Sequence, residues 1–208
     1  MQTPLAIIQG QVELLMQTNP LTEQQANLIS ELEASNQRLA RLNKSLLLLT
    51  KIENNEFVPT ESVDLVGLTT KLADSFRDYM DKQKIKLVEH FDAHPELNAN
   101  ASLIEILLSN LISNGIRHNI HGGELKIEIG ETFFKIGNTG QPNTLSPEKI
   151  FTRFYKESNH SDSTGLGLAI VKRICDMYGF PISYSFKEGI HSFSVIVRKR
   201  KGLIVDGK

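Results

Sequence analysis

The sequence predicts an α+β protein in which an antiparallel helical hairpin precedes a domain of mixed helices and strands. Over residues 1–53 apolar residues recur three and four apart, which is the period of one face of an amphipathic helix. After residue 57, segments of this kind are interspersed with stretches in which apolar and polar residues alternate, as in strands. We therefore expect a hairpin domain over residues 1–53 and a mixed domain over residues 57–208.

Two helices separated by a break are predicted for the hairpin. Asn19-Pro20 interrupts the apolar period, and Thr22 or Glu23 is suited to the start of the second helix. The apolar positions are Leu5, Ile8, Val12 and Leu15, then Leu28, Leu32, Leu39, Leu42, Leu46 and Leu49. A lone hairpin cannot cover both flanks of these apolar stripes, so we expect a second copy to complete a four-helix bundle. The alternative is that the hairpin packs on the domain that follows it.

A polar segment that ends in proline, Asn54 to Pro59, has the composition of a hinge or linker. Beyond it, Asp64 is suited to cap a helix. The apolar face of that helix would carry Leu65, Leu68, Leu72, Phe76 and Tyr79. A strand is predicted next, because Ile85, Leu87 and Phe91 fit the alternation of a strand, with Glu89 as the exception.

The helix predicted from about Ser102 has an unusual polar face. Its buried face would consist of Leu103, Ile104, Leu107, Leu108, Leu111 and Ile112. On another side, Asn110, Asn114, Arg117 and His118 fall at i, i+4, i+7 and i+8, so their polar groups project together. Asn is a poor helix former, and a glycine inside a helix, such as Gly115, costs about 1 kcal/mol relative to alanine. A helix that departs from local preferences in this way is a candidate for ligand binding.

Simpler explanations suffice for the residues that follow this helix. Asn119 and Gly122-Gly123 tolerate the left-handed conformation that ends helices, so they are read as a helix stop. His118 and His121 are three apart, but no Cys or carboxylate joins them in the sequence, whereas zinc normally has four ligands. We therefore read the spacing of these histidines as a surface feature and not as a zinc site.

A two-stranded ribbon follows the glycines. Apolar and charged residues alternate over residues 125–129, Gly130-Glu131 provides a turn, and residues 132–137 return. On the returning strand Phe134, Ile136 and Asn138 share one face, so Asn138 points inward. A buried amide without a partner costs about 1–3 kcal/mol. We therefore expect Asn138 to meet a ligand that has donor and acceptor groups.

The stretch from residue 139 to residue 163 has the composition of a lid or binding loop, with a short helix start at Ser146-Pro147-Glu148. Its segment Ser158 to Thr164 is small and polar, and we expect it to be mobile. Gly165 and Gly167 then precede a helix, where their backbone N–H groups can approach a phosphate closely. A glycine pair of this kind is also common in simple tight turns. A closing hairpin over residues 182–197 and a frayed tail, Arg198 to Lys208, complete the prediction.

Composition excludes several classes of protein. The formal net charge of −1 gives no basic excess, so nucleic acid is not expected as the main partner. The single cysteine, Cys175, rules out an internal disulfide and suits a reducing cytosol. No apolar run approaches the roughly 18 residues that a membrane helix needs, and no signal peptide begins the sequence. We therefore expect the chain to be soluble and cytoplasmic.

Taken together and in order, these segments resemble the cytoplasmic core of a bacterial two-component sensor histidine kinase. Gln2 to Gly10 resembles the second half of the H box, Asn110 to Asn119 the N box, Asn138-Thr139-Gly140 the G1 box, Phe151 to Tyr155 the F box, and Thr164 to Leu168 the G2 box. Each motif is only moderately specific, but their common order along nearly the whole chain makes a chance match unattractive.

The resemblance implies a dimerising hairpin and an α/β sandwich ATP-binding domain of the type shared with gyrase, Hsp90 and MutL. ATP and Mg²⁺ are the implied cofactors, with Asn114 as the Mg²⁺ ligand and Arg117 as a phosphate contact. The implied ATP-binding residues are Asn110, Asn114, Arg117, His118, Asn138, Gly140, Phe151, Tyr155, Thr164, Gly165, Leu166, Gly167 and Leu168. Gly165 and Gly167 would surround the phosphates as a lid closes.

The implied activity is transfer of the γ-phosphoryl group of ATP to a histidine on the hairpin. From there the group would pass to an aspartate on the receiver domain of a response regulator. The implied partners are thus a second copy of the chain, joined through the hairpin, and a receiver domain. The resemblance also implies that the parent protein is anchored in the inner membrane, with this core in the cytoplasm.

Two positions depart from the family pattern. The G1 box begins with Asp in the family, where the carboxylate accepts from the adenine amino group, and here the matching residue is Asn138. Its carbonyl oxygen can still accept, so adenine recognition is expected to survive with altered strength. The phosphoacceptor histidine, four residues before Thr3 in the family pattern, would fall just upstream of Met1. Thr3 itself corresponds to a residue that in many relatives orients the water for dephosphorylating the regulator.

Two other functions remain open from the sequence. An ATP hydrolase of the gyrase or chaperone type would carry a water-activating Glu four residues before the metal-binding Asn, and that position is Asn110, which cannot act as a base. A dimerisation and docking module without nucleotide is the other alternative. Asn138 and the histidine missing before Thr3 are the features that favour it.

Overall fold

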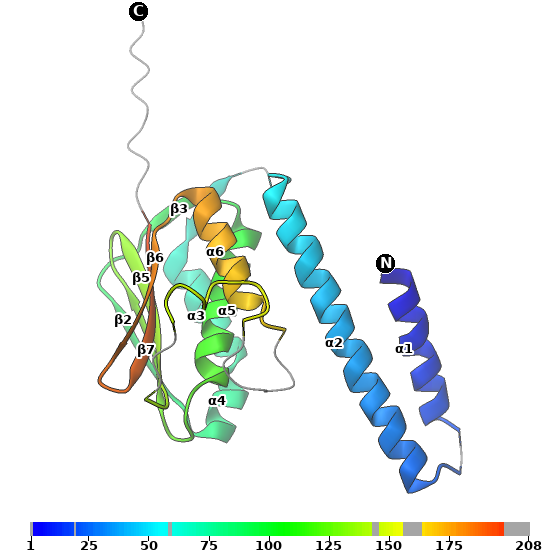
Figure 1. Ribbon diagram of the computed structural model, residues 1–208. Coiled ribbons are helices and arrows are strands. Elements are labelled where there is room, and N and C mark those ends of the chain that lie inside the picture. Colours follow the sequence, from blue (N-terminus) through cyan, green and yellow to red (C-terminus); the bar gives the residue numbers. More distant parts are fainter. Residues whose placement is uncertain (1, 19, 58–59, 143–145, 156–163, 198–208) are drawn as a thin grey trace, which may run out of the picture.

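The protein combines a long helical hairpin with a layered α/β part (Figure 1). The computed structural model describes residues 2–18, 20–57, 60–142, 146–155 and 164–197. Helices α1 (Gln2–Met16) and α2 (Glu23–Glu53) run antiparallel and pack on each other. The predicted fold class, a helical hairpin followed by a domain of helices and strands, is confirmed.

Helix α2 begins at the predicted place because its first turn has a complete capping box. The Thr22 hydroxyl accepts from the Gln25 backbone N–H at 3.3 Å, and the Gln25 side chain accepts from the Thr22 backbone N–H at 2.9 Å. Two N–H groups that the helix itself cannot satisfy thus gain partners. The capping box sets the position at which the chain turns back along α1.

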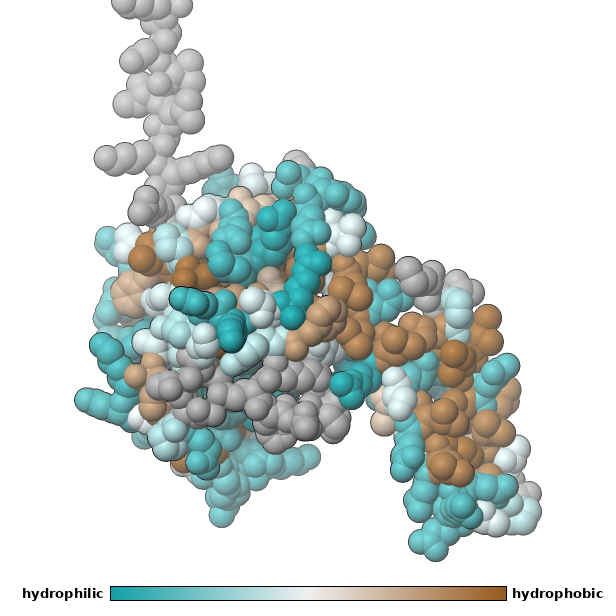
Figure 2. Space-filling model, in the orientation of Figure 1, coloured by the Kyte–Doolittle hydropathy of each residue, from teal (hydrophilic) through white to brown (hydrophobic). Residues whose placement is uncertain are grey.

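The two ends of α2 have different surroundings. Near its C-terminus Leu49 and Ile52 are buried in the core of the α/β part, where α2 packs against α6 (Gly167–Tyr178). Glu53 also pairs with Arg153 across this junction. Further along the hairpin, large apolar side chains remain exposed, namely Ile7, Ile8, Leu14, Leu15, Leu28, Leu32, Leu39, Leu46 and Leu47. The end of α2 therefore packs on the α/β part, as the alternative predicted. The rest of the apolar stripe is exposed, and its side chains appear brown on the hairpin in Figure 2.

A mixed five-stranded sheet forms the second layer, with strands in the order β2, β4, β5, β7 and β6. Strands β2 and β4 are parallel, and every other neighbouring pair is antiparallel. The strands are β2 (Lys86–Phe91), β4 (Glu124–Ile129), β5 (Phe133–Thr139), β6 (Ile182–Lys187) and β7 (Ile190–Ile196). Helices α3 (Leu65–Ser75), α4 (Arg77–Gln83), α5 (Ala101–Arg117) and α6 lie on one side of this sheet (Figure 1).

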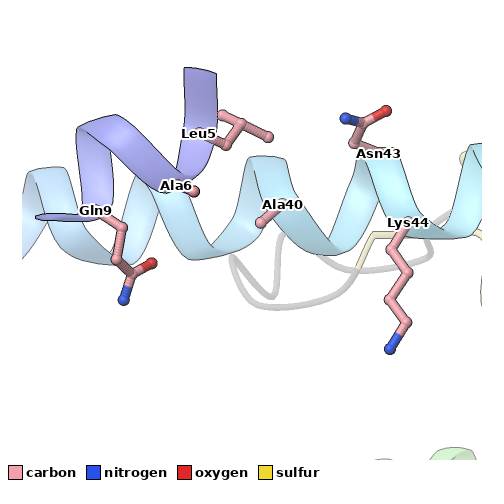
Figure 3. Close-up of a pocket in the computed structure, with 6 residues that line it drawn as sticks. All are labelled: Leu5, Ala6, Gln9, Ala40, Asn43 and Lys44. Carbon is pink, nitrogen blue, oxygen red and sulfur yellow. The ribbon is translucent and has the colours of Figure 1, made fainter. Parts of the chain in front are cut away.

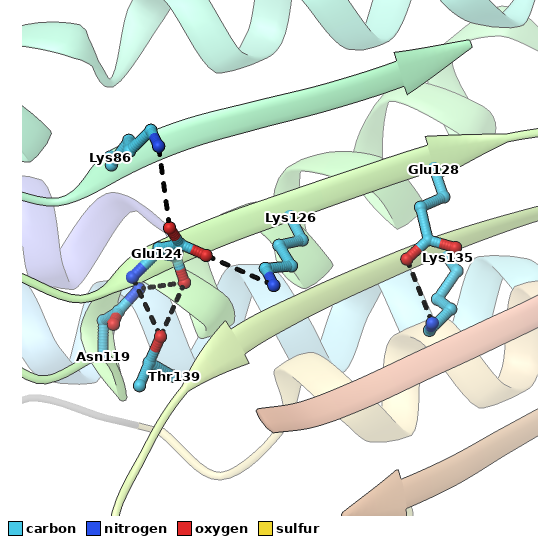
Figure 4. A network of polar contacts seen from close by, with 7 residues as sticks. All are labelled: Lys86, Asn119, Glu124, Lys126, Glu128, Lys135 and Thr139. Atoms are coloured by element: carbon cyan, nitrogen blue, oxygen red, sulfur yellow. Dashed lines mark hydrogen bonds and ion pairs between the residues drawn. The ribbon is translucent and has the colours of Figure 1, made fainter. Parts of the chain in front are cut away.

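The two faces of β4 show why the sheet carries helices on one side only. Leu125, Ile127 and Ile129 are buried, whereas the alternate residues carry charges. On that outer face Glu124 pairs with Lys126 at 3.2 Å, and Lys135 of β5 pairs with Glu128 at 3.0 Å (Figure 4). Such partly exposed ion pairs contribute about 0–1 kcal/mol each. They keep this face polar and contribute little to stability.

Three predictions of secondary structure need correction. The single helix expected over residues 65–79 is divided at Phe76 into α3 and α4. A small antiparallel sheet of β1 (Glu61–Asp64) and β3 (Glu96–Ala99) was not expected. The helix start expected at Ser146 is a series of turns, in which the Ser146 carbonyl accepts from the N–H groups of Lys149 and Ile150. The expected mobile segment, apart from Thr164, and the tail lie outside the described residues.

None of the helices in the described ranges combines the length and the apolar character that a membrane span requires.

Candidate functional site

Helix α5 is the element on which the candidate site is built. Its N-terminus is capped by Asn100, whose side chain accepts from the Leu103 N–H at 3.2 Å. The predicted apolar face is buried against the sheet and the neighbouring helices. Asn110 and Asn114 are half-buried, and Arg117 and His118 are exposed in and just after the last turn. The predicted separation of an apolar face from a polar row is therefore confirmed.

Asn138 lies at the end of β5 beside the C-terminal turn of α5. Its side chain is 2% exposed, and its amide nitrogen donates to the carbonyls of His118 at 3.2 Å and Thr139 at 3.0 Å. Both amide protons thus have main-chain partners, which corrects the expectation of an amide that lacks partners within the protein. Because the nitrogen is committed in this way, the atom of Asn138 that can serve a ligand is the acceptor Oδ1.

A glycine allows α5 to lie against this asparagine. A Cβ atom on Gly115 would come within 2.7 Å of the Leu125 Cδ1 atom and 3.7 Å of the Asn138 Cβ atom. The mid-helix glycine noted in the sequence therefore marks a close approach between α5 and the strands beneath it. Gly115 lowers the helix propensity by about 1 kcal/mol relative to alanine, but it allows a contact that a larger residue would prevent.

The start of α6 meets the polar row of α5. A Cβ atom on Gly167, the first residue of α6, would come within 2.8 Å of the Asn110 Oδ1 atom. Asn110 is oriented by its own amide nitrogen, which donates to the Ile106 carbonyl at 2.7 Å. The neighbours Leu166 and Leu168 pack into the core and anchor this turn. The G2 motif, Thr164 to Leu168, thus lies at the N-terminus of α6, as predicted.

The F motif, Phe151 to Tyr155, is hydrogen-bonded to the same turn. The Phe154 N–H donates to the Gly165 carbonyl at 2.8 Å, and a Cβ atom on Gly165 would lie 2.9 Å from the Phe154 backbone. Gly165 has φ = +69°, a conformation that favours glycine. Phe151 packs edge-on against Phe193, and Tyr155 also contacts the core. The F and G2 motifs are therefore one connected unit.

The structure brings most of the predicted residues together around α5. Asn110 lies against Gly167 at the N-terminus of α6, Asn114 follows one turn later on α5, and Asn138 meets the end of α5 at His118. Thr3 belongs to α1, whose neighbour is α2, and its side chain lies outside the described residues. Thr164 is half-buried at the edge of the loop.

Asn119 has a structural role at the end of α5, but not through the predicted left-handed backbone conformation, which is found at Gly122 instead. Its amide nitrogen donates to the Glu124 carbonyl at 3.0 Å, and its oxygen accepts from the Ile120 N–H at 3.0 Å. Thr139 joins this group through a hydrogen bond from the Glu124 N–H at 2.9 Å (Figure 4). These bonds connect the end of α5 to the adjoining ends of β4 and β5, so Asn119 shapes the turn.

Sequence reasoning missed His191, which is 9% exposed and lies in β7 directly opposite Asn138 in β5. The available signal was the alternation of His191, Phe193 and Val195, which places the histidine on the apolar face of the strand. Cys175, which was not among the predicted site residues, is buried, and burial raises the pKa of its thiol to about 12.

Two family models match the chain along these same elements. The model described as "His Kinase A (phospho-acceptor) domain" matches residues 1–55, and the model described as "Histidine kinase-, DNA gyrase B-, and HSP90-like ATPase" matches residues 99–201. The chain belongs to the sensor histidine kinase family. The first model covers the helical hairpin, and the second covers the α/β part from the end of β3 onward.

Individual relatives agree with this assignment. Sensor histidine kinase HprS of Escherichia coli is 27% identical over an alignment of 208 positions that covers 96% of this chain and 45% of HprS. Full-length ShkA in complex with AMPPNP has a TM-score of 0.75 at 22% identity over 95% of this chain and 44% of ShkA. ThkA in complex with the response regulator TrrA has a TM-score of 0.66 at 23% identity, over 97% of this chain and 60% of ThkA. The chain thus spans less than half the length of HprS, and the two structures support the fold of this histidine kinase.

A matched pair of glycine substitutions tests the contact between the F and G2 motifs. Gly165 and Gly179 both have positive φ, +69° and +66°, but no atom lies within 4 Å of the Cβ position of Gly179. Gly179→Ala is expected to lower the free energy of unfolding by about 1–2 kcal/mol through backbone strain alone. Gly165→Ala is expected to cost about 1–3 kcal/mol more through the clash with Phe154. Urea denaturation of both variants measures the difference, and equal losses would contradict the contact.

Proposed function

We propose that this chain is the catalytic core of a two-component sensor histidine kinase, with an ATP-binding domain over residues 57–208 and a dimerising, phosphotransfer hairpin over residues 1–53. In the whole protein the γ-phosphoryl group of ATP passes to a histidine of the hairpin and then to an aspartate of a receiver domain. The observation that carries this proposal is the junction of α5 and α6, where the amide of Asn110 lies against Gly167 at the start of α6, one turn before Asn114 on the same polar row. Calorimetric titration with ATP, with and without Mg²⁺, tests it.

The phosphates are assigned to the start of α6. Leu166, the N-cap residue of α6, forms no side-chain capping hydrogen bond. The first N–H groups of a helix lack partners within the helix and favour an anion. Arg117 makes no ion pair among the described residues, and its guanidinium is suited to bidentate contact with phosphate.

The donor set fits Mg²⁺ bound jointly with a nucleotide. Asn114 is half-buried in the polar row, and its amide oxygen is a hard ligand of the kind that Mg²⁺ accepts. Because Mg²⁺ usually keeps several waters and takes phosphate oxygens, one protein oxygen suffices for such a site. When bound, the ion would neutralise charge on the transferring phosphoryl group. Asn114 would hold it, and Asn110 would support the adjoining turn of α6.

Adenine is assigned to Asn138. The two main-chain hydrogen bonds of its nitrogen orient Oδ1 as the remaining acceptor, which suits the amino group of adenine. Asparagine is therefore matched to its surroundings, since a carboxylate in the same position would face two carbonyl oxygens. We infer that this residue preserves adenine recognition, and the docking module without nucleotide loses its main support.

Hydrolysis of ATP by the chain itself is disfavoured. The position that supplies the base in related ATPases is Asn110, whose amide nitrogen donates to the Ile106 carbonyl. An amide cannot accept a proton from water at neutral pH. The site supports nucleotide binding and phosphoryl positioning, and transfer needs a separate nucleophile such as the histidine of the hairpin.

The hairpin is assigned to dimerisation. Several side chains of its leucine stripe are exposed, among them Leu32 and Leu39, which are 55% and 52% exposed. A contiguous apolar surface of this kind is typical of a helix bundle that a second copy completes. A homodimer through α1 and α2 would bury it.

The receiver domain is assigned to the open groove between the two helices. A hollow of about 430 Å³ is lined by Leu5, Ala6 and Gln9 of α1 and by Ala40, Asn43 and Lys44 of α2 (Figure 3). It lies close along α1 to Thr3, and Lys44 supplies a positive charge that suits an acidic phosphorylation site. The complex of ThkA with TrrA supports a partner of this class. We place the reaction in the cytoplasm, where ATP and receiver domains are found.

Removal of the proposed metal ligand should abolish the Mg²⁺-dependent part of ATP binding. Asn114→Ala is expected to raise the dissociation constant of ATP in Mg²⁺ by about tenfold or more, and to change it little in EDTA. Asn98→Ala, on an exposed strand position, is the matched control and should bind like the wild type. Calorimetry measures all three proteins. Unchanged affinity for Asn114→Ala in Mg²⁺ would rule out the metal assignment.

Restoring the family's acid at the G1 motif should weaken binding. Asn138→Asp exchanges two hydrogen bonds to the His118 and Thr139 carbonyls for repulsion, so the expected loss of ATP affinity is about tenfold. Asn98→Asp adds the same charge at an exposed position and is expected to be neutral. Tighter ATP binding by Asn138→Asp would contradict the expected loss, because it would show that aspartate recognises adenine better than asparagine at this position.

A charge within the leucine stripe should separate the dimer. Leu39→Lys is expected to weaken self-association by about tenfold or more, because a bundle interface would desolvate the ammonium group. Gln37→Lys places the same charge on another face of α2 and is expected to leave association unchanged. Sedimentation equilibrium provides the measurement, and equal behaviour of both variants would exclude this stripe as the interface.

A further inference from the structure

His191 of β7 occupies a buried position behind the G1 motif. It pairs directly with Asn138 across the β5–β7 ladder. Its ring lies 4.5 Å from the ring of Phe186 and 6.0 Å from the ring of Tyr184, measured between centroids. Both neighbours belong to β6, the edge strand of the sheet, so His191 connects that edge to the proposed adenine site.

Two hydrogen bonds determine the tautomer of His191. Its Nε2 atom lies 3.0 Å from the Gln141 carbonyl oxygen, and its Nδ1 atom lies 2.7 Å from the Tyr184 hydroxyl oxygen. A carbonyl can only accept, so Nε2 carries the hydrogen. In the neutral ring Nδ1 then accepts from the Tyr184 hydroxyl. Tyr184 thereby holds His191 in the form that donates to Gln141.

The ring also fills the space beside Gly140. A Cβ atom on Gly140 would come within 2.4 Å of the His191 Cδ2 atom and 2.7 Å of its Nε2 atom. The Gly140 N–H is held as well, since it donates to the Gly189 carbonyl at 3.0 Å. The turn that follows Asn138 is thus in contact with His191 at Gly140 and hydrogen-bonded to it at Gln141.

We propose that His191, oriented by Tyr184, is a positioning residue for nucleotide binding that holds the Gly140-Gln141 turn and thereby Asn138 in the conformation that receives adenine. This role rests on the adenine assignment of Asn138 made above. A turn that is already ordered loses less conformational freedom when a ligand binds. His191 raises affinity in this way without touching the nucleotide.

The first test compares two substitutions at His191. His191→Phe keeps an aromatic ring between Tyr184 and Phe186 but has no hydrogen-bonding group, whereas the amide nitrogen of His191→Gln can occupy the position of Nε2 and donate to Gln141. The dissociation constant of ATP with Mg²⁺ is expected to rise about threefold to tenfold in His191→Phe, the equivalent of one hydrogen bond. In His191→Gln it should stay within about twofold of the wild type. Equal affinities of wild type and His191→Phe would overturn the proposal.

A second variant and a spectroscopic measurement do not depend on the folding of His191→Phe. Tyr184→Phe removes one hydroxyl, and nitrogen NMR of the His191 side chain should then show loss of the single Nε2–H tautomer, together with weaker ATP binding. An unchanged tautomer with unchanged affinity would overturn the role of Tyr184 and with it the proposed mechanism.

A double-mutant cycle separates positioning from general stability. In the background of Asn138→Ala, replacement of His191 by Phe should no longer change ATP affinity, because the group that it positions is absent. An equal loss in both backgrounds would show that His191 acts only through the fold. If the wild-type chain binds no ATP, the proposed function fails and this role fails with it. If the wild type binds and His191→Phe binds equally well, only the positioning role fails.

Discussion

The close contact of α5 with the sheet at Gly115 is the constraint on which the rest of the site depends. With no side chain at this position, α5 approaches Leu125 and Asn138 closely enough for the Asn138 amide to reach the carbonyl of His118. The apolar face of α5 is buried in the same core, and Asn110 of the polar row lies against Gly167 at the start of α6. The residue that weakens α5 as an isolated helix therefore determines where its amides lie.

The motif glycines are explained as much by protein packing as by a ligand. The space that a Cβ atom would need is occupied at Gly167 by Asn110, at Gly165 by Phe154 and at Gly140 by His191. Gly167 and Gly140 thus allow contact between segments that are far apart in the sequence, and Gly165 allows contact with the nearby Phe154. Of the three, only Gly165 has a positive φ. The first backbone N–H groups of α6 have no side-chain cap, so they are suited to a phosphate.

Local periodicity predicted the helices and most strands, because each long element buries one regular face. The hairpin, α5 and the alternating strands β4, β5 and β7 followed from it, whereas the caps at Thr22 and Asp64 followed from residue type. It failed for β1 and β3, whose four residues each are too short for a pattern, and at Phe76, where the apolar period continues across the break. The surroundings of Asn138 and the position of His191 depend on pairing between distant strands, which no local pattern contains.

The junction between the hairpin and the α/β part rests on apolar burial more than on charge. Ile52 is 0% exposed and Leu49 is 2% exposed, and burial of each such side chain is worth about 1.5–3 kcal/mol. The pair of Glu53 with Arg153 is partly exposed, at 39% and 49%, so its contribution is about 0–1 kcal/mol. Arg153 belongs to the segment whose Phe154 is bonded to Gly165, and Ile52 shares the core with α6. Separation of the hairpin would therefore cost several kcal/mol of apolar contact and would remove packing from the helix whose N-terminus faces the proposed phosphates.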